Sequence, residues 1–233
     1  MADARTTTTT TTRGDRTRAS VLTAATGHLA AHGLEGLRGG QVAADAGVSE
    51  ATVWFHFGTK QGLLIAVMEA YYDGLVADID DVVASASSPI GRLEAFAHFW
   101  LRRMAKDLPL VGEFERHGRT GHDDDVVTAF ASCNRRITRG FERLVEDLTA
   151  GGRLREDLPT WIVRDTFFGT AEHLVVGRAV TGRATDLDHA AQLLLTVLLE
   201  GVGTIPGPGA TAATDGPTLA SLDAKLDRLL AQP

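Results

Sequence analysis

Two short helical segments joined by a three-residue turn constrain this chain more than any other feature of its sequence. They occupy residues 42–57, which read VAADAGVSEATVWFHF. Gly47 permits a tight turn, Ser49 is a suitable N-cap for the segment that follows, and Val53 is placed to fill the core between the two segments. This layout is typical of a helix-turn-helix, in which the second helix presents its outer face to a major groove of DNA.

Four consecutive rings lie in the second segment: Trp54, Phe55, His56 and Phe57. A helix points consecutive side chains in different directions, so only Phe57 shares the inward face of Val53, four residues earlier. We therefore expect Trp54, Phe55 and His56 to lie away from that face. Exposed aromatic side chains on a polar protein indicate a binding partner. The segment is predicted both to anchor itself and to present a contact surface.

Composition limits the kind of surface that this partner can meet. The 233 residues carry a formal net charge of −7, so a surface for nucleic acid must be local. A single cysteine, Cys133, excludes an intramolecular disulfide and a cysteine-cluster metal site. The sequence has no apolar signal core, and no apolar stretch reaches the ~18 residues of a membrane-spanning helix. We expect a cytoplasmic protein without a membrane partner.

Apolar residues recur at helical spacing through most of the chain, and no stretch shows the alternation of a strand. The pattern predicts an all-α fold. Helices are expected over residues 15–32, 41–46, 50–56, 60–82, 89–106, 123–150, 159–180 and 187–202, with a separate short helix that begins at Pro109.

Four regions follow from these patterns. Residues 1–14, with seven consecutive threonines, are expected to be a disordered tail. Residues 15–60 form the helix-turn-helix domain, and residues 61–202 form a second helical domain. Residues 203–233 begin as a linker rich in Gly, Pro, Ala and Thr, and residues 219–230 have the spacing of one short amphipathic helix.

The N-terminal region resembles the DNA-binding domain of the TetR family of transcriptional regulators. The resemblance covers about forty-five residues and rests on Ala24-Ala25, Gly33, Val42-Ala43, Ala46 to Ser49, Thr52, Val53, Trp54, Phe57 and Lys60. It implies that the protein binds operator DNA, and that the second domain dimerises and holds a small-molecule effector.

The resemblance also implies which residues contact DNA. Thr52, Trp54, His56 and Lys60 occupy positions that bind the phosphate backbone, and Arg38 stands where a capping Ser or Thr usually contacts phosphate. Glu50, Ala51 and Phe55 occupy positions that face bases. Three departures from the family pattern are Trp54 in place of Tyr, Arg38 in place of a cap, and Gly39-Gly40 in place of residues that often include a basic side chain.

Aromatic residues of the second domain are candidates for lining an effector pocket, because pockets for apolar ligands are mostly apolar. They are Phe96, Trp100, Phe114, Phe130, Phe141, Phe167 and Phe168. Rings at helical spacing are also what a plain core contains. His98, His117 and His122 match no metal-ligand spacing, and no nucleophile arrangement or phosphate-binding glycine loop is visible, so we expect no metal, no cofactor and no catalysis.

The resulting hypothesis is a repressor that binds palindromic operator DNA as a homodimer and is released by a small apolar effector. The helices near 160–180 and 186–202 are expected to form the dimer interface. Two alternatives stay open. One is a helical small-molecule-binding protein or enzyme with a vestigial helix-turn-helix, which the missing basic residues at Gly39-Gly40 would favour. The other is a DNA-binding protein regulated by a partner protein.

Overall fold

The computed structural model describes residues 13–182 and 186–201, and within these residues the chain is helical throughout. The expected tail at residues 1–12 and the expected linker and short helix at 203–233 lie outside the described residues. The helices are α1 (Arg13–His32), α2 (Gly39–Ala46), α3 (Glu50–Phe57), α4 (Lys60–Ala84), α5 (Pro89–Arg119), α6 (Asp124–Ala150), α7 (Thr160–Thr181) and α8 (Leu187–Thr196), with short turns η1 (Leu34–Gly36) and η2 (Val197–Gly201).

Side-chain caps next to the helices explain why most boundaries fall where the sequence predicts them. Ser49, Thr59, Ser88 and Asp123 each accept a hydrogen bond from the backbone N–H three residues later, at 3.0–3.1 Å. Each cap satisfies one of the backbone donors that a helix start leaves unpaired. Helix α1 begins at Arg13, so residues 13 and 14, which we expected in the tail, belong to a helix.

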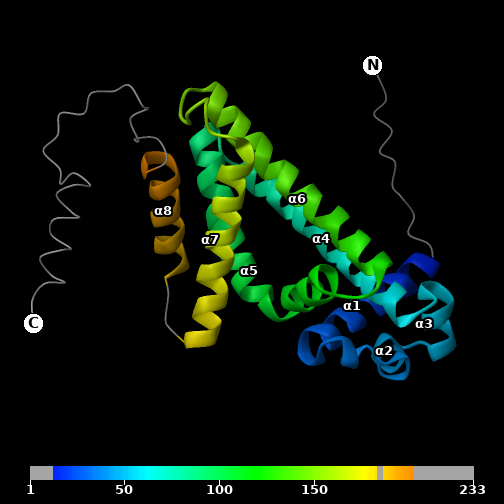
Figure 1. Cartoon of the computed structure of the whole chain (residues 1–233). Coiled ribbons are helices and arrows are strands. Elements are labelled where there is room, and N and C mark those ends of the chain that lie inside the picture. Colours follow the sequence, from blue (N-terminus) through cyan, green and yellow to red (C-terminus); the bar gives the residue numbers. More distant parts are fainter. Residues whose placement is uncertain (1–12, 183–185, 202–233) are drawn as a thin grey trace, which may run out of the picture.

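The expectation of a separate helix beginning at Pro109 is wrong, because Pro109 lies inside the continuous 31-residue α5. A proline in a helix interior removes one backbone hydrogen bond and crowds the preceding turn, so it kinks or breaks a helix. A packed core around the proline favours a kink over a break. Helix α5 changes direction along its length in Figure 1. Buried side chains on both sides of the proline, Leu101 and Phe114, hold the two halves in the core.

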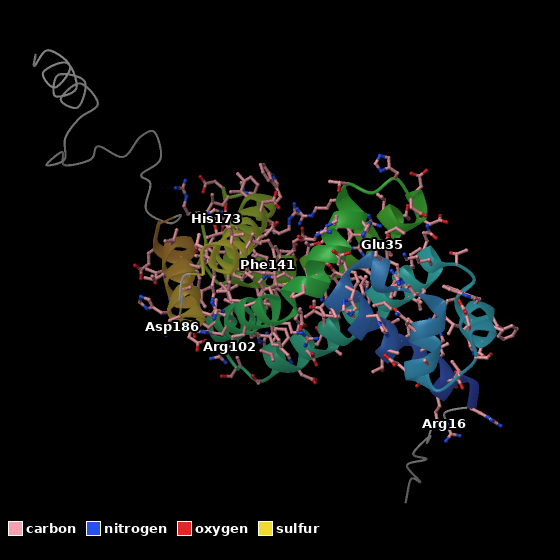
Figure 2. The ribbon with its side chains drawn as sticks, turned by 90° about the horizontal axis from the view of Figure 1, so that it is seen from below. Arg16, Glu35, Arg102, Phe141, His173 and Asp186 are labelled. Carbon is pink, nitrogen blue, oxygen red and sulfur yellow. The ribbon has the colours of Figure 1, made fainter. Side chains whose placement is uncertain are left out.

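Helices α1–α3 gather at one end of the molecule, and α8 lies at the opposite end (Figure 1). The long helices α4, α5 and α6 connect the two ends, and α7 packs on α5 and α6 beside α8. Figure 2 gives the same arrangement from below, with Arg16 and Glu35 at the α1–α3 end, Arg102 and Asp186 at the other, and Phe141 between the helices. None of the described helices has the length and apolarity needed to span a membrane.

Candidate nucleic-acid interface and ligand cavity

The turn between α2 and α3 is built by local backbone chemistry. Gly47 adopts a left-handed conformation with φ 69° and ψ 32°, and the backbone N–H of Val48 donates to the carbonyl of Ala43 at 3.0 Å. L-residues with a side chain disfavour that conformation, so glycine suits the position. The Ser49 hydroxyl then caps α3 and also lies 2.8 Å from the Thr52 hydroxyl. These contacts set the angle at which α3 leaves the turn.

Helix α3 anchors one face and exposes another. Val53 and Phe57 are buried, as the four-residue spacing predicts, while the ring of Phe55 is 85% exposed. His56 lies against Phe55 with the two ring centroids 5.5 Å apart in an edge-on arrangement. An aromatic ring this exposed forms no part of the core, so α3 presents an apolar group on its outer face.

Trp54 is not the freely exposed side chain that we expected. It is half-buried against the core, and its indole N–H donates to the Glu50 carboxylate at 3.2 Å, one helical turn earlier. Glu50 and Trp54 therefore bind each other, although the resemblance assigned one to bases and the other to phosphate. In this structure the pair forms a ridge over the start of α2.

The glycine at position 39 makes room for this ridge. A Cβ atom on Gly39 would lie 2.4 Å from the Trp54 ring and 2.5 Å from a Glu50 carboxylate oxygen, closer than real side chains approach. A Cβ on Gly40 would meet only Glu50, at 3.4 Å, which is nearly an ordinary contact. The bulkier Trp54 and the glycine at position 39 are thus matched by packing.

The remaining predicted DNA-contact residues surround α3. Ala51 is exposed on the first turn of α3, and the Thr52 hydroxyl lies next to that of Ser49. Arg38 is exposed at the N-cap of α2 and makes no capping hydrogen bond, as a guanidinium cannot accept one. Lys60 begins α4, and its ammonium lies 3.8 Å from the carboxylate of Glu35. That exposed pair is weak and open to competition from a phosphate.

One cationic side chain that we did not select also belongs to this surface. The Arg18 guanidinium on α1 lies over the Phe57 ring, 5.4 Å from its centroid. The exposed N-terminal turns of α1, which also carry Arg13 and Arg16, therefore lie close to α3. The closely spaced arginines in the sequence were the signal for this group. Their position beside α3 depends on the packing of α1.

A buried carboxylate joins this end of the molecule to α5. Glu113 is 7% exposed, and one of its oxygens accepts a hydrogen bond from the backbone N–H of Leu34 at 2.9 Å. The same carboxylate lies 3.1 Å from the Arg116 guanidinium and 3.4 Å from the His117 ring. It fills the space beside Gly33, where a Cβ would lie 2.9 Å from it. Glu113 therefore ties α5 directly to the turn after α1.

Most aromatic residues predicted for the effector site pack against each other or against neighbouring helices. Phe96, Phe141 and Phe167 are fully buried, with ring centroids 4.7–5.6 Å apart. Phe114 packs against Tyr71 and Tyr72. Phe130 packs so closely against Gly118 that a Cβ there would lie 2.2 Å from its ring. Rings in such contact belong to the hydrophobic core. The sequence allowed two interpretations of these rings, pocket lining and plain core.

A cavity of about 470 Å³ lies beside this core, between α4, α5, α6 and α7. Of the seven aromatic residues predicted to line it, only Trp100 and Phe168 do so. The other apolar lining residues were not selected, because an aliphatic residue at helical spacing does not differ from core in sequence. They are Met104, Leu108, Val111, Val175 and Val176.

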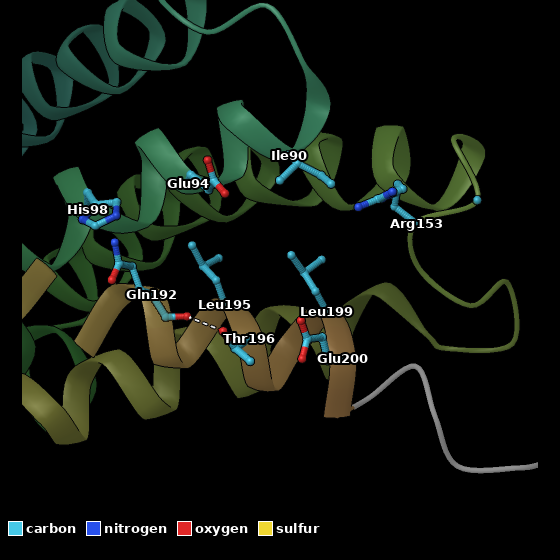
Figure 3. Close-up of a pocket in the computed structure, with 10 residues that line it drawn as sticks. Ile90, Glu94, His98, Arg153, Gln192, Leu195, Thr196, Leu199 and Glu200 are labelled. Carbon is cyan, nitrogen blue, oxygen red and sulfur yellow. Dashed lines mark hydrogen bonds between the residues drawn. The ribbon is translucent and has the colours of Figure 1, made fainter. Parts of the chain in front are cut away.

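A second cavity, of about 620 Å³, separates the first turns of α5 from α8 and η2. Figure 3 shows Ile90, Glu94 and His98 on one side and Leu195 and Leu199 on the other. The ring of His98 lines it, but no Phe, Tyr or Trp side chain of the described residues does. The cavity of about 470 Å³ is the better candidate for a ligand, since aromatic and aliphatic side chains form part of its wall and suit the apolar part of a molecule. Charged side chains form the rest of that wall: Glu115, Arg119, Arg135, Arg164, Asp165 and Glu172.

Helices α7 and α8 expose apolar side chains at the end far from α3. Val180 is 80% exposed, and Trp161, Leu193 and Val197 are each more than half exposed. Apart from Phe55, every strongly exposed large apolar residue among the described residues is on α7, α8 or η2. Exposed apolar side chains concentrated on two neighbouring helices mark a site of association.

The helix-turn-helix, with its buried inner face and exposed outer ring on an all-helical scaffold, defines the class of helix-turn-helix regulatory proteins. Within that class, residues 21–67 match the model described as bacterial regulatory proteins, tetR family. Residues 21–67 are therefore similar to the N-terminal domain of that family.

Solved structures agree with this assignment at the level of the fold. The fatty acid degradation regulator FadR from Bacillus halodurans is 20% identical, with a TM-score of 0.69, and the alignment covers 79% of this chain and 98% of that one. FadR from Bacillus subtilis in complex with stearoyl-CoA is 16% identical, with a TM-score of 0.67 and the same coverage. The MbdR regulator from Azoarcus sp. CIB is 19% identical, with a TM-score of 0.63, covering 79% and 98%. No curated protein sequence matches the chain.

Proposed function

We propose that this protein is a ligand-responsive transcriptional repressor that binds palindromic operator DNA as a homodimer. The observation that carries the proposal is the helix-turn-helix in which Val53 and Phe57 anchor α3 while Phe55 projects outward. A helix held in this way can enter the major groove and place two or three side chains on base edges.

On this proposal, the side chains around α3 divide into two groups. Phe55 and Ala51 have no hydrogen-bond donor, so their contribution is apolar contact, for which the methyl group of thymine is the partner in the major groove. Lys60, His56, Arg38 and Thr52 carry donors that suit phosphate oxygens, and such contacts position the helix without reading sequence. Glu50 and Trp54 hold each other and support α3 from one side.

The exposed apolar face of α7 and α8 supports a two-fold dimer. Contact of Val180, Leu193 and Val197 with water is unfavourable. A second copy that packs on this surface would remove these side chains from water. Because this face lies at the end far from α3, a dimer formed there leaves both recognition helices free. Their spacing would match half-sites about one helical turn apart, ~34–36 Å, or a multiple of it.

We propose that the effector is a small, largely apolar molecule bound in the cavity between α4 and α7. One side of α5, including Met104, Leu108 and Val111, faces the cavity, and Glu113 on the same helix holds the backbone of Leu34. Helix α4, which contributes Tyr72 to the cavity, begins directly after α3. A ligand that shifts either helix changes the position of α3. FadR from Bacillus subtilis, which has a similar fold, binds stearoyl-CoA, whose acyl chain is apolar and whose CoA portion is anionic.

The test compares two alanine variants in salt titrations on an operator selected from random DNA and on unrelated DNA. Lys60→Ala should weaken binding to both duplexes about equally and reduce the salt slope by about one unit per subunit, because an ammonium–phosphate contact carries no sequence information. Phe55→Ala should lose about 1–3 kcal/mol on the operator and little on unrelated DNA. A Lys60→Ala variant that changes operator preference, or a Phe55→Ala variant that changes nothing, would contradict this placement of α3.

The structure weakens the argument for a vestigial helix-turn-helix. The glycine at position 39, which favoured that alternative, is accounted for by the volume of Trp54. Regulation by a partner protein instead of a ligand is the other alternative, and the presence of a cavity with aromatic and aliphatic side chains in its walls favours the ligand. Operator binding that persists unchanged across a panel of apolar ligands would support the partner protein.

A further inference from the structure

The hydroxyl of Tyr72 opens into the cavity without a protein partner. Tyr72 is 5% exposed and lines the cavity, yet no hydrogen bond to its hydroxyl is present within the described residues. In the described part of the chain, no fully enclosed side-chain oxygen or nitrogen lacks a partner, so this hydroxyl must reach accessible space. The neighbouring Tyr71 differs, because its hydroxyl donates to Asp107 at 3.1 Å.

Burial keeps the Tyr72 hydroxyl protonated. Desolvation raises its pKa well above the ordinary value for tyrosine, and the nearby Glu115 carboxylate adds to the rise. A neutral phenol is a hydrogen-bond donor, and a buried donor without a partner costs free energy. The cavity thus contains a donor that a ligand oxygen would satisfy.

Two arginines of the same walls are already paired with carboxylates. The Arg119 guanidinium lies 3.1 Å from the Glu115 carboxylate on its own helix and 3.6 Å from Glu172 on α7. Arg164 is likewise paired with Glu142 at 2.6 Å and with Asp165 at 2.8 Å. An anionic ligand group would have to displace a carboxylate from one of these pairs or remain at the exposed Arg135 on α6. A neutral oxygen, by contrast, can accept a hydrogen bond from Tyr72 without displacing any carboxylate.

We propose that the cavity selects an electrically neutral, largely apolar molecule with one carbonyl or hydroxyl oxygen, which accepts a hydrogen bond from Tyr72. This inference rests on the proposed role of the cavity as the effector site and specifies the chemistry of its ligand. Trp100, Phe168 and Leu108 provide the apolar walls, and the volume of about 470 Å³ is within the usual range for small-molecule sites.

Three fluorescent probes on one skeleton test the proposal: pyrene, 1-acetylpyrene and 1-pyrenecarboxylate. We expect the full-length protein to bind the neutral ketone more tightly than the hydrocarbon or the carboxylate. Tyr72→Phe removes only the hydroxyl and should weaken the ketone about 3- to 10-fold, which is the usual contribution of one net hydrogen bond, while leaving pyrene unchanged. Tyr71→Phe is the matched control and should leave the affinities for all three probes unchanged, since its hydroxyl is held by Asp107.

Each other outcome has a definite meaning. Tightest binding of the carboxylate, or an equal effect of Tyr72→Phe on all three probes, would overturn the proposal. Failure of every probe to bind would overturn both the proposal and the effector role of the cavity. Tyr72-dependent binding of the ketone that leaves operator affinity unchanged would support the ligand chemistry, and only the proposed link to DNA binding would then fail.

Discussion

The packing of several individual residues in this protein depends on one neighbouring residue. Gly39 and Trp54 are such a pair, since the glycine leaves the space that the indole ring occupies. Glu113 is a buried carboxylate that accepts a hydrogen bond from the Leu34 amide, and Tyr72 is a buried phenol whose hydroxyl has no hydrogen-bond partner among the described residues. The effect of a substitution at one of these positions on stability should therefore depend on the residue that it contacts.

We expect Gly39→Ala to lower the free energy of unfolding by about 1–3 kcal/mol, because the added methyl group overlaps the Trp54 ring. In a Trp54→Tyr background the cost should be smaller, since the tyrosine ring lacks the indole atoms that the methyl group meets. Gly40→Ala is the control and should be neutral or stabilising by up to about 1 kcal/mol, the helix-propensity gain. Urea denaturation of the four variants measures this, and equal cost in both backgrounds would refute the matched packing.

The Glu115 carboxyl should give stability a particular pH dependence. Burial raises its pKa above the ordinary 4.5, with Arg119 opposing the rise and Glu172 adding to it. The folded state then binds the proton more tightly than the unfolded state. The stability that this group contributes is full below its unfolded pKa and is lost as pH rises through the raised folded pKa.

Glu115→Gln removes this titration, so the variant should gain stability relative to the parent chain as pH rises from about 4.5 towards neutrality. Urea midpoints of both proteins across that range give the comparison. A stability difference that stays constant with pH would show that the Glu115 pKa is the same in the folded and unfolded states.

At the scale of secondary-structure elements, α5 contacts both the cavity and the turn after α1. Side chains on one side line the cavity, and Glu113 connects another side to the turn after α1. Pro109 lies between Leu108 and Val111 of the cavity wall, at a point where the helix lacks one backbone hydrogen bond. The helix is therefore placed to carry a displacement from the cavity to the DNA-binding domain.

Glu113→Ala should loosen this connection. The Leu34 amide would lose its acceptor, with a cost of about 1–3 kcal/mol, and its hydrogen exchange should become faster than in the parent protein. Arg116→Ala removes an ion-pair partner that is 70% exposed and should cost at most about 1 kcal/mol without affecting exchange at Leu34. Unchanged exchange in Glu113→Ala would mean that this hydrogen bond does not hold the two domains together.

At the scale of the whole molecule, the two ends have different exposed apolar surfaces. The α3 end presents Phe55, and the α7–α8 end presents a wider set of aliphatic residues and Trp161. Helices α3 and α8 lie at opposite ends of the molecule (Figure 1). Separation of the two surfaces allows one to pair with a second copy while the other meets DNA.

Leu193→Glu should convert the dimer to a monomer at micromolar concentration, because a carboxylate would lie in the apolar face of α8. The same change at the other end, Phe55→Glu, should leave the dimer intact. Sedimentation velocity distinguishes the two species. A parent protein that is already monomeric, or a Leu193→Glu variant that remains dimeric, would place the interface elsewhere.

Local chemistry allowed the sequence to predict much of the fold and the buried face of α3. The caps Ser49, Thr59, Ser88 and Asp123 act within three residues along the chain, and the turn at Gly47 depends on the conformation of one residue. The spacing of Val53 and Phe57 likewise gave the buried face of α3 without knowledge of distant residues.

Contacts between helices were decided only by the tertiary structure. The sequence did not show that Trp54 pairs with Glu50 above Gly39, that α5 continues through Pro109, or that five of seven candidate rings lie outside the cavity wall. Helical spacing identifies the apolar side of a helix, but core and cavity wall share that side. Which residues meet and which leave a space depends on how helices distant in the sequence pack together.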